Sequence, residues 1–306
     1  MTQKTIKIGT RDSQLALWQA KTVEARLNEL GYVTQIVPIK SAGDVILDKP
    51  LYEFGITGIF TKTLDVAMIS GQVDIAVHSM KDVPTALPKG IVQTAVLHRE
   101  STADILVYNQ LPDFTQTLTI ATGSLRRQAQ WLNRYPHHQC VDLRGNVNTR
   151  LAKLAQSDWG GAIFAAAGLE RLNIKPLNNL ELDWMLPAPA QGAMVVVAMH
   201  DDWFCREATE KLNHPHSEVC TFVERQFLRE LEGGCTAPIG AHATVVDSQI
   251  RFEGVLCSLD GTQKIHIEKT VELYKGHTDF GRDCAREVLD SGGRELMRTI
   301  KNSLDR

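Results

Sequence analysis

The sequence alternates short apolar strands with amphipathic helices, and this alternation occurs twice with a similar beginning. Two predicted strands end in Thr10 and Thr122, and Ser13 and Ser124 follow them in positions that cap a helix. Strand–helix–strand units imply a mainly parallel sheet covered by helices. The chain is therefore predicted to be an α/β protein with two similar parts.

Apolar periodicity predicts the individual elements. In the first part, strands are expected at 4–10, 32–40 and 73–78, and helices at 13–30 and 60–70. In the second, strands are expected at 105–108, 118–122, 139–143 and 162–166, and helices at 124–134 and 148–156. In the third, a helix at 217–232 is followed by strands at 241–246, 250–258 and 264–273 and a helical tail from 278.

The length of 306 residues favours more than one domain, because a single core rarely grows beyond about 250 residues. After a linker at 187–190, the apolar strand at 194–199 is expected to return to the first domain. We expect α/β domain 1 at 1–98 and 193–212, α/β domain 2 at 99–192, and a smaller α+β domain 3 with a three-stranded sheet at 213–306.

The composition is that of an ordinary folded protein, with 43% hydrophobic residues, 23% charged residues and a net charge of -3. It excludes disordered, collagen-like and coiled-coil proteins. The longest apolar run is too short for a membrane helix, and nothing resembles a signal peptide, so a cytoplasmic protein is expected. The six cysteines and ten histidines lack metal-site spacing, and no metal is predicted.

Basic residues are concentrated between residues 121 and 153. This segment contains six basic residues and a single acidic one, Asp142; the basic residues are Arg126, Arg127, Arg134, Arg144, Arg150 and Lys153. One interpretation is a solvated basic surface. The other is an anionic partner, because arginine binds carboxylates and phosphates through two donors at once.

The placement of these arginines favours the anionic partner. If Ser124 caps its helix, Arg126 and Arg127 occupy the second and third helical positions, where the helix dipole disfavours cations. An anion at that helix end would remove the conflict. Arg144 and Arg150 repeat the arrangement, and Arg11 adds a cation from domain 1, so the site is expected between the two domains.

Two further segments could carry chemistry. Lys81 and Asp82 follow a predicted strand and form either a surface ion pair or, beside arginines, an acid/base group. Cys235 follows two glycines and is either a small buried residue or a nucleophile. The nearest candidate base is His242.

At these positions the chain resembles the porphobilinogen deaminase (hydroxymethylbilane synthase) family. The matching motifs lie within 10–20, 43–44, 74–84, 124–128, 143–150, 167–171, 187–192 and 231–235, and they include Thr-Arg, His-Ser-Met-Lys-Asp-Val-Pro, Ser-Leu-Arg-Arg-Gln, Leu-Arg-Gly-Asn-Val and Leu-Glu-Gly-Gly-Cys. Each motif alone is weak, but together and in this order they are highly specific.

The resemblance implies two domains similar to periplasmic binding proteins and a third that carries the cofactor cysteine. It implies a transferase of haem and tetrapyrrole biosynthesis that joins four porphobilinogen molecules head to tail, with loss of ammonia, and releases hydroxymethylbilane with water. The primer would be one dipyrromethane cofactor held by a thioether to Cys235. A monomer is expected, with no nucleic-acid or membrane partner.

The resemblance also implies roles for single residues. Asp82 would be catalytic and would stabilise the cation left when ammonia departs. The residues implied in cofactor and substrate binding are Arg11, Ser13, Gln19, Phe60, Ser79, Lys81, Thr122, Ser124, Arg126, Arg127, Arg144, Gly145, Arg150, Arg171 and Gln191. The arginines would bind the acetate and propionate groups of the pyrroles.

Some expectations stay open at this point. Thr57 stands where many members of the family carry a lysine, which puts a lid role of that loop in doubt. A non-catalytic anion-binding module is an alternative, because fold alone does not decide function. A nucleic-acid binder is disfavoured by the net acidity and the few aromatic residues.

Overall fold

The computed structural model describes residues 4–40, 61–232 and 237–304. The chain divides into two compact units. Of the described residues, unit 1 comprises 4–40, 61–100 and 192–218, and unit 2 comprises 101–191, 219–232 and 237–304. The further division of unit 2 into domains 2 and 3 stays a prediction.

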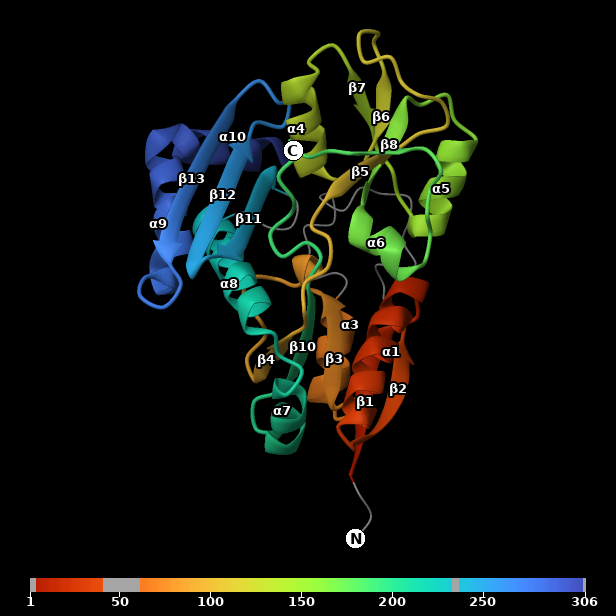
Figure 1. The fold of residues 1–306 in the computed structure, drawn as a ribbon, viewed down its shortest axis with the longest axis vertical. Coiled ribbons are helices and arrows are strands. Elements are labelled where there is room, and N and C mark those ends of the chain that lie inside the picture. Colours follow the sequence, from red (N-terminus) through yellow and green to blue (C-terminus); the bar gives the residue numbers. More distant parts are fainter. Residues whose placement is uncertain (1–3, 41–60, 233–236, 305–306) are drawn as a thin grey trace. The chain divides into compact units, whose positions relative to one another are not determined.

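Unit 1 contains a five-stranded sheet in the order β2-β1-β3-β10-β4. Its strands are β1 (Thr5–Arg11), β2 (Val33–Ile39), β3 (Ile75–Ser79), β4 (Ile91–Val96) and β10 (Met194–Met199). β1 runs parallel to β2 and β3, whereas β10 is antiparallel to both β3 and β4. The expected return of the strand at 194–199 to the first sheet is confirmed (Figure 1).

Helices cover both faces of this sheet. α1 (Gln14–Glu29) and α7 (Trp203–Glu210) bury apolar residues against the same face as Ile6 and Ile8 of β1. α3 (Lys62–Ile69) packs on the opposite face, where Leu64 lies so close to Gly9 that a Cβ at residue 9 would approach it to 3.2 Å.

The ends of α1 follow the predicted signals. Ser13 is the N-cap and accepts a hydrogen bond from the Ala16 amide, and Gly31 after the helix has the left-handed φ of 86° that suits glycine. Leu30, the last residue of the expected helix, lies just beyond α1 and is 48% exposed.

Unit 2 repeats the strand arrangement in the order β7-β6-β8-β5-β9. The strands are β5 (Asp104–Val107), β6 (Thr119–Ala121), β7 (Gln139–Val141), β8 (Gly161–Ala165) and β9 (Asn179–Glu181), with helices α4 (Leu125–Arg134), α5 (Val147–Ala155) and α6 (Ala166–Arg171). β5 is antiparallel to both neighbours, as β10 is in unit 1. The prediction of two similar α/β parts is therefore confirmed.

A three-stranded antiparallel sheet follows in unit 2, in the order β11-β12-β13. It consists of β11 (Ile239–Val246), β12 (Gln249–Cys257) and β13 (Lys264–Glu272). Helices α8 (Pro215–Glu230), α9 (His277–Val288) and α10 (Arg294–Leu304) bury a separate apolar core against it (Figure 1). A kink at Leu289–Gly293, where Gly292 has a φ of 101°, joins α9 to α10. The expected C-terminal three-stranded sheet is confirmed.

Most predicted elements are present, with ends shifted by at most two residues, but four elements of the described residues were missed. These are β4, β9, α6 and α7. β9 is short and wholly exposed, and α6 has only six residues, so neither produces a clear apolar period.

No helix in the described ranges is long and apolar enough to cross a membrane. The five cysteines in those ranges form no disulfide with one another, and four of them are buried, as expected for plain thiols. Cys235 lies outside the described residues.

The C-terminal sheet offers a direct test of its separate core. Phe227 is fully buried on α8 and its ring meets that of Phe252 edge to face, with centroids 5.1 Å apart. We expect Phe227→Ala to lower the free energy of unfolding by about 3–5 kcal/mol in urea titrations, because it leaves a cavity. Phe222→Ala on the same helix should change it by less than about 1 kcal/mol, since Phe222 is 43% exposed.

Candidate functional site

In unit 1, the sheet brings the ends of two parallel strands together. Arg11 is the last residue of β1 and Ser79 the last of β3, and these strands are neighbours. The Ser13 hydroxyl accepts the Ala16 amide at 3.3 Å, which starts α1 directly after Arg11. Polar groups therefore gather at the carboxyl edge of the sheet, where α/β proteins usually bind ligands.

Gln19 and Ser79, both expected in the site, contact each other. The Gln19 side chain on α1 is buried, and its Nε2 donates to Ser79 Oγ at 2.7 Å. This bond fixes the Ser79 hydroxyl at the end of β3. The family resemblance implied both residues but not the bond between them.

His78 comes just before Ser79 and is buried at the same edge. Burial, and to a smaller extent the positive charge of Arg11, lower the pKa of His78 to about 4. The imidazole is therefore neutral at physiological pH. Lys81 and Asp82 follow in a short 3-10 turn, η2 (Met80–Asp82), and both are partly buried.

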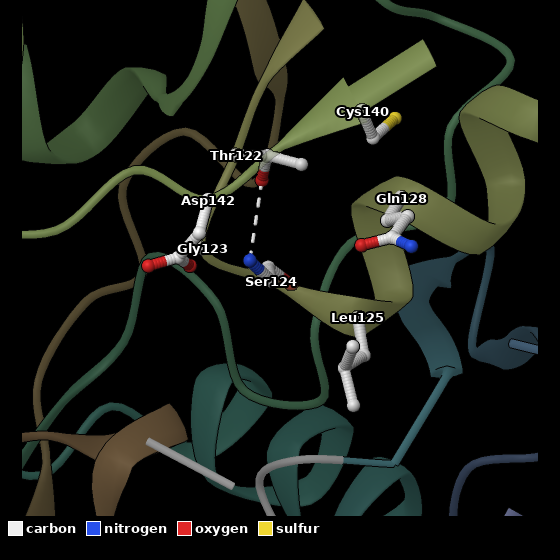
Figure 2. Close-up of a pocket in the computed structure, with 7 residues that line it drawn as sticks. All are labelled: Thr122, Gly123, Ser124, Leu125, Gln128, Cys140 and Asp142. Carbon is white, nitrogen blue, oxygen red and sulfur yellow. Dashed lines mark hydrogen bonds between the residues drawn. The ribbon is translucent and has the colours of Figure 1, made fainter. Parts of the chain in front are cut away.

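In unit 2, the turn between β6 and α4 is closely packed. Ser124 caps α4, as predicted, and its own amide donates to Thr122 Oγ1 at 3.2 Å (Figure 2). A Cβ at Gly123 would lie 2.6 Å from the Leu143 carbonyl oxygen, so only glycine permits this approach of the turn to the segment after β7.

This turn borders a small cavity of about 190 Å³. Its lining residues are Thr122, Gly123, Ser124, Leu125, Gln128, Cys140 and Asp142 (Figure 2). Burial raises the pKa of the Cys140 thiol to about 12, so Cys140 stays protonated and is no nucleophile. The cavity lies at the N-terminal end of α4, where the helix dipole favours negative charge.

Arg126 and Arg127 point into the protein and share one carboxylate, that of Asp104. Arg126 Nη1 lies 2.7 Å from Asp104 Oδ2, and Arg127 donates to Asp104 Oδ1 from Nε at 3.1 Å and from Nη2 at 2.8 Å. Arg126 and Arg127 are only 4% and 6% exposed, and Asp104 is fully buried. The alternative of a solvated basic surface is therefore excluded for these two arginines.

This cluster corrects one step of the sequence argument. The two arginines do stand at the second and third positions of α4, but Asp104, a side chain of the protein itself, supplies an anion for both. No external anion is needed to offset the first of the two charges. Two guanidinium groups thus share one carboxylate. In the described residues, no second carboxylate forms a hydrogen bond with Arg126 or Arg127, so one positive charge of the cluster is not balanced.

The electrostatics of the cluster follow from this imbalance. Burial opposes ionisation of Asp104, but the adjacent guanidinium groups outweigh it and hold the pKa of that carboxyl well below its usual range. Burial and the neighbouring charge of Arg127 lower the pKa of Arg126, although Asp104 opposes the shift. Arg126 Nε is buried and has no hydrogen-bond partner in the part of the chain that the structure describes.

Gln191 joins the same cluster from the end of the linker. Its Nε2 donates to Asp104 Oδ1 and to the Thr102 carbonyl oxygen, each at 2.8 Å, and the side chain is fully buried. The structure thus brings together three predicted residues, Arg126, Arg127 and Gln191, around one residue that was not predicted.

A second arginine-containing turn follows β7. The helix expected at 148–156 begins one residue earlier, as α5 at Val147, and Asn146 caps it by accepting the Thr149 amide at 2.9 Å. Arg150 Nε donates to the Gly145 carbonyl oxygen at 2.8 Å, which folds the arginine back over the turn. Arg144 directly precedes Gly145 and is partly buried.

The remaining predicted residues are dispersed or not described. Arg171 is buried at the end of α6. Phe60, Thr57 and Cys235 lie outside the described residues. His242, considered as a base for Cys235, lies on β11 with Nε2 3.3 Å from Thr102 Oγ1.

The residue that sequence reasoning missed is Asp104. A signal was available, because an aspartate opens the apolar run 104–107 and a buried acid requires a partner. The partners stand 22 and 23 residues further on, and nothing in the local pattern connects them.

The fold and the site define an α/β protein with an arginine–carboxylate cluster beside the carboxyl ends of parallel strands. Residues 6–207 match the family model described as porphobilinogen deaminase, dipyromethane cofactor binding domain. Residues 219–290 match porphobilinogen deaminase, C-terminal domain. The chain belongs to the porphobilinogen deaminase family, which is a family of transferase enzymes.

Relatives match over nearly the whole length. The porphobilinogen deaminase of Pelotomaculum thermopropionicum is 41% identical, covering 98% of this chain and 98% of the relative. The porphobilinogen deaminase of Chlorobium phaeobacteroides is 38% identical, and the match covers 98% of this chain and 99% of the relative. Among solved structures, a distantly similar one is the probable amino-acid ABC transporter extracellular-binding protein ytmK of Bacillus subtilis. Its sequence identity is 12% and its TM-score is 0.43, and the match covers 69% of this chain and 90% of that chain.

Asp104 should be essential to the stability of unit 2. Replacing it in Asp104→Asn leaves two buried guanidinium groups without a carboxylate, and we expect the free energy of unfolding to fall by about 3–5 kcal/mol in denaturant titrations. Asp183→Asn, at an exposed position of the same unit, is the matched control and should change it by less than about 0.5 kcal/mol. Equal effects of the two variants would contradict the role given to Asp104.

Proposed function

We propose that this chain is a hydroxymethylbilane synthase that condenses four porphobilinogen molecules head to tail, with loss of ammonia, and releases the linear product with water. Family membership over nearly the full length supports the reaction. The single observation of the structure that carries the proposal is the unmatched positive charge of the Arg126–Arg127–Asp104 cluster. Porphobilinogen carries an acetate and a propionate, so both substrate and product are polyanions.

The described residues fit a dipyrromethane cofactor that bears carboxylates. Arg126 has a buried Nε without a partner in the described residues, and the α4 N-terminus adds the Ser124 and Thr122 hydroxyls. Carboxylates bind well to guanidinium groups and helix N-termini. When bound, this group would supply the pyrrole carbon to which the first porphobilinogen is joined.

In the proposal, the arginines hold carboxylates and set the orientation of the pyrrole rings. Arg126 and Arg127 would do so from α4, and Arg144 and Arg150 from the turn before α5. The bond from Arg150 to the Gly145 carbonyl supports this role, because it restricts the arginine to one region of the turn before any ligand binds. Arg11 and Arg171 complete the proposed set.

Asp82 would be the catalytic residue of unit 1. Its carboxylate would face pyrrole N–H groups, stabilise the positive charge that develops as ammonia leaves, and accept the proton released when a new ring is joined. Its position supports the role, since it lies in the turn directly after β3 at the carboxyl edge of the sheet. Gln19 would hold Ser79 in place for the same ligand.

Cys235 would hold the cofactor through a thioether. We expect the intact mass of the purified protein to exceed the sequence mass by one dipyrromethane per chain. Cys235→Ser should have the sequence mass and no synthase activity, because its hydroxyl is a much weaker nucleophile than a thiol. Cys140→Ser is the matched control and should keep the added mass, since Cys140 is held protonated. An unmodified wild-type mass, together with no bilane formation, would overturn the proposal in favour of a non-catalytic anion-binding module.

Asp82→Ala should keep the fold and lose turnover. We expect kcat to fall by at least about a hundredfold, the usual loss for a general acid–base group, with the thermal midpoint close to that of the wild type. Turnover is measured as porphobilinogen consumption. Asp201→Ala, at an exposed site of the same unit, should retain full kcat. Normal turnover of Asp82→Ala would exclude a catalytic role.

We also propose a cytoplasmic monomer without nucleic-acid or membrane partners, which rests on the family resemblance. The net charge of -3 gives no general attraction to nucleic acid. Light scattering of the purified protein should return the mass of one chain, and a larger particle would contradict the monomer.

A further inference from the structure

The side-chain amide of Gln130 on α4 forms two hydrogen bonds with the backbone of Leu186. Its Nε2 donates to the Leu186 carbonyl oxygen at 2.9 Å, and the Leu186 amide donates to its Oε1 at 2.9 Å. The Gln130 side chain is buried. Two opposed hydrogen bonds fix both the position and the orientation of the Leu186 peptide groups.

The same carbonyl oxygen is shared with Arg126. Arg126 Nη1 donates to Leu186 O at 2.7 Å, in addition to its contact with Asp104. Arg126 precedes Gln130 by one helical turn, so the two side chains reach Leu186 from the same face of α4. The place of Leu186 therefore helps to determine where the Arg126 guanidinium lies.

The backbone at 186–187 also contacts β11. The Ala241 amide donates to the Pro187 carbonyl oxygen at 3.0 Å. Gly240 lies so close to Leu186 that a Cβ at residue 240 would be 2.9 Å from both the Cβ and the carbonyl oxygen of Leu186. β11 begins at Ile239, four positions after Cys235 in the sequence.

We propose that Gln130 is a positioning residue, which acts through the Leu186 backbone to set where Arg126 lies relative to the strand that follows Cys235. This inference rests on the proposed function, because it concerns the arginine and the cysteine that would hold the same cofactor. Gln130 itself touches neither cofactor nor substrate in this role. Its bond to Leu186 O is the critical one, since that oxygen is shared with Arg126.

The test compares Gln130→Met with a second amide on the same helix. Methionine has a similar length and shape but makes neither bond to Leu186. Asn133 Nδ2 donates to the Gly261 carbonyl oxygen at 2.8 Å, so Asn133→Leu also removes a bond from α4 to a loop without touching Leu186. Three quantities are measured for each protein: the fraction of chains with the added cofactor mass, KM and kcat per loaded chain, and the thermal midpoint.

We expect Gln130→Met to load a smaller fraction of chains and to raise KM about tenfold, with kcat per loaded chain within about twofold of the wild type. Asn133→Leu should lower the thermal midpoint while loading and KM stay at wild-type values. Loss of loading in both variants to the same extent would overturn the inference and leave Gln130 with a structural role only. Normal loading and KM in a folded Gln130→Met would overturn it as well.

Gln130→Glu keeps the test decisive if the methionine variant does not fold. Glutamate retains an acceptor for the Leu186 amide but, when ionised, has no donor for Leu186 O. We expect loading and KM to change as in Gln130→Met. Wild-type loading and KM in a folded Gln130→Glu would overturn the inference. A wild-type protein without added mass would instead contradict the proposed function.

Discussion

The buried carboxylate of Asp104 is the interaction on which the second unit depends. A carboxylate removed from water is costly unless it is paired and hydrogen-bonded, and Asp104 meets both conditions through two guanidinium groups and the Gln191 amide. These partners come from α4 and from the end of the linker, so one side chain of β5 holds two distant segments. The cluster contains two guanidinium groups but one carboxylate, so one positive charge is in excess. This excess positive charge makes the cluster suitable for an anionic ligand.

The two five-stranded sheets supply the frame for such clusters. In each sheet, three neighbouring strands are parallel, and an antiparallel strand, β10 or β5, lies between them and the strand at the edge, β4 or β9. The carboxyl ends of the three parallel strands therefore lie at a common edge. In unit 1 this edge presents Arg11, Ser79 and the turn with Asp82. In unit 2 it presents the capped start of α4. A repeated topology thus produces two polar edges from different residues.

Local patterns were enough to predict the strand–helix order, the Ser13 and Ser124 caps, and the positions of Arg126 and Arg127 on α4. They were not enough to predict which residues these side chains contact. Asp104 pairs with residues of α4 that are more than 20 positions away in the sequence, and Gln130 bonds to Leu186 across 56 positions. Such contacts depend on tertiary packing, which periodicity and capping rules do not describe. The same limit explains why β9 was missed, since within the described residues it pairs with β5 alone and is exposed throughout.

The strand order of the first sheet also constrains the order in which the protein can be completed. β4 lies at the edge of that sheet and is joined to β3 only through β10, although more than 90 residues of chain separate β4 from β10. As the chain emerges from the ribosome, the second sheet has all its strands once residue 181 has been made, whereas the first must wait until residue 199. Of the two five-stranded sheets, the N-terminal one is therefore the later to be completed, and until then the edge of β3 is open to incorrect pairing.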